Sequence, residues 1–78
     1  MGYVVRLSRE VGDTKGQITI DGYIDNRPRR IQATLGESDY LLADKAHTHE
    51  ELVMCTGELV REGRSYTLRN PHSFTILD

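Results

Sequence analysis

The chain has 78 residues, of which 37% are hydrophobic and 28% charged, and its formal net charge is −2 at pH 7. This composition is typical of a folded globular protein, and it excludes a disordered chain and a protein that gathers nucleic acid by global positive charge. The length predicts one domain over residues 1–78 and leaves little room for a deep catalytic pocket, so a non-catalytic binding module is favoured over an enzyme.

Three strands are predicted in the first half of the chain, because apolar and polar residues alternate there with a period of two. They cover residues 3–10, 17–25 and 30–35, and glycine- and proline-containing turns separate them. In the first strand, Tyr3, Val5 and Leu7 are expected to share one face. The unbroken alternation over residues 17–25 is the strongest strand signal in the sequence.

A helix is predicted over residues 39–49, with Ser38 as its N-cap, because Gly36 ends the third strand and good helix formers follow. A fourth strand is expected over residues 52–61 and a fifth over residues 64–69, joined by a hairpin turn at Glu62 and Gly63. Asn70, Pro71 and His72 are expected to end the fifth strand, and a short closing strand over residues 73–77 follows.

Three strands, a helix and a hairpin form the element order of a small closed β-barrel of the oligonucleotide/oligosaccharide-binding (OB) type, with five to six antiparallel strands. The helix would then close one barrel end between the third and fourth strands. An SH3-like barrel with an inserted helix is the second choice, and an open α+β sheet is the third. The predicted core consists of Ile18, Ile20, Ile24, Ile31, Leu35, Val53, Leu59, Leu68 and Phe74.

In the second half of the chain, apolar and polar residues alternate on both sides of the predicted hairpin turn. The pattern consists of Val53, Cys55, Gly57, Leu59, Arg61, Gly63, Arg64, Leu68, Asn70, Pro71 and Phe74. Over residues 50–77 this pattern resembles small uncharacterised bacterial OB-like domains. The resemblance implies a small barrel, and it implies no catalytic residue.

Cysteine usage and spacing bear on compartment and on metal binding. The lone Cys55 cannot form an internal disulfide, and no apolar run approaches the ~18 residues of a membrane span, so we expect a cytoplasmic protein. The three histidines, His47, His49 and His72, and the cysteine lack the spacing of a metal site. We predict no metal, no cofactor and no catalytic residue.

Two binding surfaces are predicted instead. Nucleic acid would bind on the face of the second and third strands, where Tyr23 could stack on a base and arginines gather nearby. The candidate residues are Tyr23, Arg27, Arg29, Arg30, Arg61 and Arg64. Asp21 and Asp25 flank Tyr23 and would repel phosphates, which counts against this hypothesis.

The second surface would bind another protein or a second copy of the chain. Leu52, Met54 and Val60 are apolar where alternation predicts solvent, and a short barrel often leaves a strand edge unpaired. Because the net charge is negative and outward aromatics are few, the sequence slightly favours protein interaction or self-association over single-stranded nucleic acid. A small enzyme or metal-binding protein is the third alternative.

Overall fold

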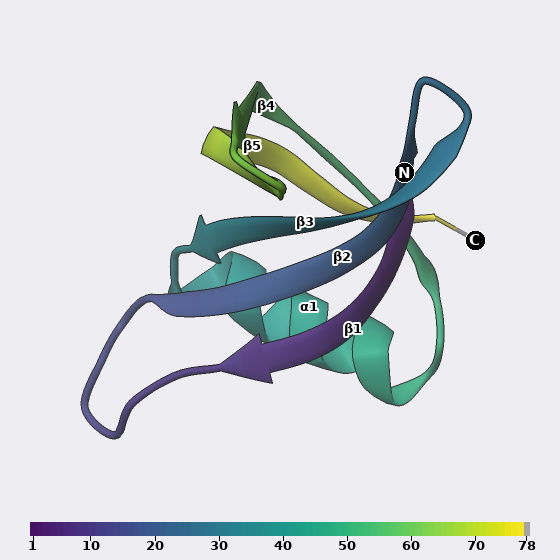
Figure 1. Ribbon diagram of the computed structural model, residues 1–78. Helices are drawn as coiled ribbons and strands as arrows, with labels where there is room; N and C mark the ends of the chain where they lie inside the picture. The colour runs from purple at the N-terminus through teal and green to yellow at the C-terminus, as the bar shows by residue number, and fades with distance from the viewer. Residues whose placement is uncertain (78) are drawn as a thin grey trace.

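A computed structural model describes residues 1–77 and shows five strands and one helix (Figure 1). In chain order these are β1 (Gly2–Ser8), β2 (Gly16–Ile24), β3 (Arg27–Leu35), α1 (Glu37–Thr48), β4 (Leu52–Glu62) and β5 (Ser65–Leu77). The predicted fold class is confirmed: a mostly-β chain whose five strands form one closed sheet, with one short helix between the third and fourth strands. No helix within residues 1–77 is long and apolar enough to cross a membrane.

The sheet closes in the order β1-β2-β3-β5-β4, and the neighbours are antiparallel except for β3 and β5, which run parallel. The prediction of antiparallel strands throughout is therefore wrong at this one pair. A ring of five strands cannot alternate direction all the way round, so one neighbouring pair must be parallel.

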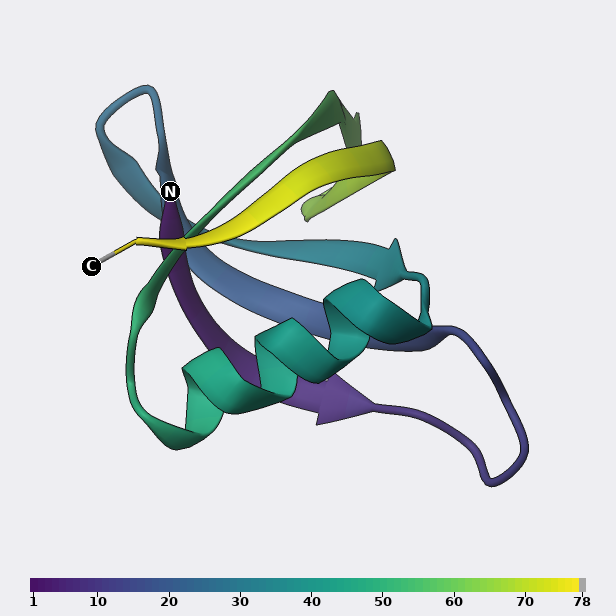
Figure 2. The same ribbon diagram turned by 180° about the vertical axis from the view of Figure 1, so that it is seen from behind.

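Closure of the barrel is uneven. The β2–β3 ladder runs along the whole of both strands, from Gly16 opposite Leu35 to Ile24 opposite Arg27. The β1–β4 ladder consists of only Gly2 opposite Val53 and Tyr3 opposite Leu52. The hairpin of β4 and β5 consequently flares away from the rest of the sheet, as Figures 1 and 2 show.

The break predicted at residues 70–72 is wrong, because β5 continues through it to Leu77. Asn70 and Ser73 adopt positive φ angles of 49° and 55°, and the β4–β5 register shifts twice between Met54 and Glu58. These bulges leave Pro71 without a required ladder bond, so the strand bends there instead of ending. The predicted fifth and sixth strands are one.

A bulge also overturns the predicted facing of β1. Its register against β2 shifts between Val4 and Arg6. As a result Val4 is buried in the core, whereas Tyr3 and Val5 are exposed and only Leu7 is partly buried. The extra residue exchanges the two faces, because side chains alternate along a strand.

Helix α1 begins two residues earlier than predicted, at Glu37, with Gly36 rather than Ser38 at the N-cap. No side chain caps it, but the Gly36 carbonyl oxygen accepts the first helical bond from the Tyr40 amide at 2.8 Å. The helix lies against β1 and β2 (Figure 2). Its buried residues are Tyr40, Ala43 and Ala46. Small residues at two of these three positions let the helix lie close to the sheet.

The predicted core is largely confirmed. Ile18, Ile20, Leu35, Val53 and Phe74 are buried. Three further predicted core residues are only partly buried: Ile24, Ile31 and Leu68. Leu59 is 44% exposed, so its placement in the core is wrong; it lies on the flared part of β4.

Candidate functional site

The outer face of the sheet is polar where β1, β2, β3 and β5 lie side by side. Arg6 stands opposite Thr19, Thr19 opposite Gln32, and Gln32 opposite Thr67, so one row crosses four strands. Since directly opposed residues on a sheet point to the same side, these side chains share one surface.

A hollow of about 190 Å³ lies on this surface. β1 and β2 contribute Arg6 and Thr19, and β3 contributes Arg29, Arg30 and Gln32. The start of β5 and the turn before it supply the remaining wall: Arg64, Ser65 and Tyr66. Four arginines from three separate parts of the chain therefore line one small hollow.

A second hollow, of about 410 Å³, lies further along β3 and β5. Thr34, two residues beyond Gln32 on the same side of β3, lines it together with Thr67, which pairs with Gln32. Lys15 from the β1–β2 loop and Arg69 from β5 add two more cations. We call the two hollows together the basic groove.

Charge is strongly segregated in this groove. Six of the ten lysines and arginines line it, and no Asp or Glu does: the six are Arg6, Lys15, Arg29, Arg30, Arg64 and Arg69. Within residues 1–77 two of the six form ion pairs, Arg30 with Asp21 and Arg69 with Glu62, each at 3.7 Å and solvent-exposed. Such exposed pairs stabilise a fold by ~1 kcal/mol or less, so these arginines can readily exchange partners for an anion.

The structure brings together three of the six predicted nucleic-acid residues, namely Arg29, Arg30 and Arg64. Arg61 lies beside the groove: its guanidinium is 5.7 Å from the centroid of the Tyr66 ring, and its Nε donates to the Gly63 carbonyl at 3.0 Å. Tyr66 pairs with Arg61 across the β4–β5 hairpin and lies at the border of the first hollow.

The other two predicted residues, Tyr23 and Arg27, do not line the groove. They lie near the β2–β3 turn, and Tyr23 is 75% exposed. Sequence reasoning missed Arg6, Lys15 and Tyr66 as lining residues. Alternation alone separates Arg6 from its apolar neighbour Leu7, but only the strand order places Arg6 beside β2 and β3.

The predicted interaction surface is divided. Met54 is 41% exposed, and Leu52, partly buried, pairs with Tyr3 of β1 and with Leu77 of β5. Val60 pairs with Thr67 beyond the two bulges of the β4–β5 ladder. Val60 lies six positions beyond Met54 along β4, which corresponds to ~20 Å at ~3.3 Å per residue. Leu52 and Met54 can act together, whereas Val60 is too distant to join them.

Among residues 1–77 no group of three or more His, Cys, Asp or Glu side chains could hold a metal ion. Cys55 is partly buried and packs against the core. Burial raises the pKa of its thiol, and the negative charge of Asp39 adds to the rise, while backbone hydrogen bonding at His72 and at Thr56 opposes it. A thiol in this state is a poor nucleophile.

No protein family matches this chain in a comparison with known families. No curated protein and no solved structure matches it either. The resemblance to bacterial OB-like domains over residues 50–77 therefore has no counterpart in these comparisons.

Proposed function

We propose that this protein is a non-catalytic binding module that holds single-stranded nucleic acid in the basic groove. The observation that carries the proposal is the gathering of six cations, without a lining carboxylate, in a chain whose net charge is −2. Concentrating positive charge at one place in an acidic protein costs stability through repulsion, and a bound polyanion offsets that cost.

The position of the groove supports a nucleic-acid chain as the polyanion. In barrels of this architecture, oligonucleotides bind across the second and third strands and between the loops β1–β2 and β4–β5. Here those two loops supply Lys15 and Arg64, one to each hollow. Both cations would then meet the same bound strand.

A single strand fits the groove better than a duplex does. From Arg30 to Thr34 the floor along β3 extends ~13 Å at ~3.3 Å per residue, which suits a few nucleotides of extended backbone. The guanidinium planes of Arg6 and Arg64 offer surfaces on which an unpaired base can stack, and a duplex keeps its base faces hidden. Gln32 and the threonines can donate to phosphate oxygens between the arginines.

The proposal predicts salt-sensitive binding of labelled oligothymidylate, measured by fluorescence anisotropy. Each phosphate contact contributes ~0.7 to the slope of log K against log salt for a single strand. Replacing Arg6 and Arg64 together by glutamine should weaken binding at least ~10-fold at low salt and lower that slope by ~1 to 1.5.

Arg27→Gln is the matched control, because it removes the same charge from a residue outside the groove. Arg27→Gln should change the affinity for the oligonucleotide much less than Arg6→Gln or Arg64→Gln does as a single variant. Flat titrations with the unaltered protein at 20 mM salt would refute the proposal, as would equal losses for Arg27→Gln and Arg64→Gln. Circular dichroism of each variant separates lost binding from lost fold.

A further inference from the structure

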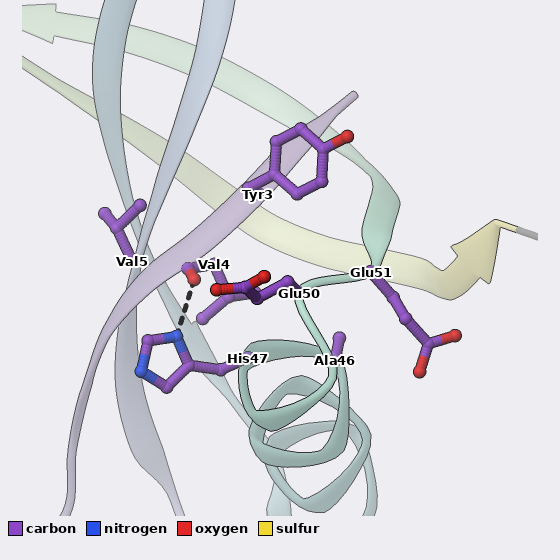
Figure 3. Close-up of a pocket in the computed structure, with 7 residues that line it drawn as sticks. All are labelled: Tyr3, Val4, Val5, Ala46, His47, Glu50 and Glu51. Atoms are coloured by element: carbon purple, nitrogen blue, oxygen red, sulfur yellow. Dashed lines mark hydrogen bonds between the residues drawn. The ribbon is translucent and has the colours of Figure 1, made fainter.

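Another pocket lies away from the two hollows of the basic groove, between β1 and the end of α1 (Figure 3). Its volume is about 380 Å³, and no lysine or arginine lines it. Val4 and Ala46 form a buried apolar floor, and Val5 and Tyr3 stand beside it on β1. A pocket of this volume with an apolar floor accommodates the aliphatic part of one long side chain.

His47 lines this pocket from the end of α1. Its Nδ1 atom lies 2.7 Å from the carbonyl oxygen of Val4, drawn as a dashed line in Figure 3. A carbonyl oxygen only accepts, so Nδ1 carries the proton and donates it. In the neutral ring Nε2 then has no hydrogen, and it can accept a bond from a ligand.

The other polar groups of the pocket also accept. Glu50 and Glu51 follow α1 directly, and both line the pocket. In Figure 3 the Glu50 side chain is turned toward β1, above His47, while Glu51 extends in the opposite direction. Ionised carboxylates have no donor, so the pocket offers negative charge and acceptors over an apolar floor.

We propose that this pocket binds an arginine side chain of a partner protein. The stem of the arginine would lie on Val5 and Ala46, and its guanidinium would donate to Glu50 and to Nε2 of His47. A guanidinium carries five donors in a plane, and it also stacks on an aromatic face such as that of Tyr3, which is half exposed. An anionic or purely apolar ligand would leave these acceptors unpaired.

A protein partner, rather than a free cation, is favoured by the surface that adjoins the pocket. Tyr3 opposes Leu52, and Leu52 opposes Leu77, so an apolar row runs from the pocket edge across three strands. Met54 lies next to this row and is 41% exposed. A small cation would leave the row uncovered, whereas apolar residues flanking an arginine in a polypeptide would cover it.

The proposal is tested with the peptide acetyl-Leu-Arg-Leu-amide, titrated into ¹⁵N-labelled protein and followed by NMR. Amide shifts should concentrate at Tyr3, Val5 and His47, and Thr19 and Gln32 of the basic groove should stay in place. The same peptide with citrulline, which keeps the shape and loses the charge, should bind at least ~10-fold more weakly.

Variants separate the pocket from general surface charge. Glu50→Gln should weaken the arginine peptide ~10-fold. Glu50 has a φ of 54°, and glutamine accepts that backbone conformation about as well as glutamate does. Glu58→Gln, an exposed change on β4 outside the pocket, is the control and should leave affinity unaltered.

Three outcomes would overturn the proposal. One is equal binding of the arginine and citrulline peptides, and another is a set of shifts outside the pocket. The third is a long-range ¹H–¹⁵N spectrum that places the His47 proton on Nε2. The free protein provides a further check, because residues 27–30 of a second copy include three arginines. If amide shifts at the pocket and at residues 27–30 both changed with protein concentration, the pocket would bind a second copy of the chain, and the proposal of a different partner protein would be wrong.

Discussion

The two halves of the barrel are held together very differently. In the first half, β2 is paired along its length with β3 and along much of it with β1, and α1 covers the inner side. Eight of the ten core residues come from this half, and only Val53 and Phe74 come from β4 and β5. In the second half, β4 has no ladder partner on its outer edge from Met54 onward within residues 1–77.

The difference shows what an alternating sequence does and does not specify. Alternation selects which side chains share a face, but burial of that face requires another layer of structure over it. Ile18 and Leu59 both occupy inward positions by pattern, yet Ile18 is 1% exposed and Leu59 is 44% exposed. Only Ile18 has α1 and the neighbouring strands around it.

The largest effect is therefore expected from Ile18→Ala, which should lower the free energy of unfolding by ~2–5 kcal/mol because it leaves a cavity in the core. The same truncation at the flared end, Leu59→Ala, should cost less than ~1 kcal/mol. Urea denaturation followed by circular dichroism measures both. Equal losses would mean that the hairpin half is packed as tightly as the helix-covered half.

A smaller effect is expected at Gly16, the first residue of β2. A methyl group added there would collide with the ring of Tyr40 on α1, so Gly16→Ala should cost ~1–3 kcal/mol through overpacking. Gly36 is the matched position, because its φ is −67° and a methyl group there meets only open space. Gly36→Ala should cost less than ~1 kcal/mol. Thermal melts of the two variants would reveal a reversed order if α1 were loosely attached.

The smallest effect concerns Cys55, where β4 still reaches the core. Burial, followed by the charge of Asp39, raises the pKa of this thiol, so less thiolate is present at pH 8 than in the unfolded chain. Iodoacetamide should alkylate the native protein more slowly than the urea-unfolded protein, and the native rate should keep rising at higher pH. Asp39→Asn should quicken the native reaction slightly. Mass spectrometry measures both rates, and a native rate at or above the unfolded one would contradict the assignment.

Sequence reasoning succeeds where one local signal decides the outcome. The nine residues of β2 alternate without a break, and the structure keeps them in register with β3 throughout. It fails where a bulge adds a residue. In β1 the shift between Val4 and Arg6 exchanges the faces, and at Asn70 and Ser73 positive φ angles carry β5 past a proline. No composition or spacing rule predicts the bulge between Val4 and Arg6.

The candidate sites follow the same division. Arg29 and Arg30 are neighbours in the sequence, and their grouping is visible there. Lys15 and Arg6 join them only because the strands close in a particular order. The pocket between β1 and the end of α1 is still harder to predict from the sequence. It forms only because the end of α1 lies near Tyr3, a residue more than forty positions earlier in the chain.

The row from Tyr3 through Leu52 to Leu77 makes a circular permutation of the chain feasible. It places residues 3 and 77 on either side of a single strand, ~10 Å apart at ~4.8 Å per strand spacing. About four residues of extended linker span that gap. Joining the ends and cutting beside the fully exposed Val11 gives a circular permutant that keeps every strand pair. The basic groove and the pocket between β1 and α1 should therefore both persist in the permutant, because each depends on the packed elements and not on where the chain starts.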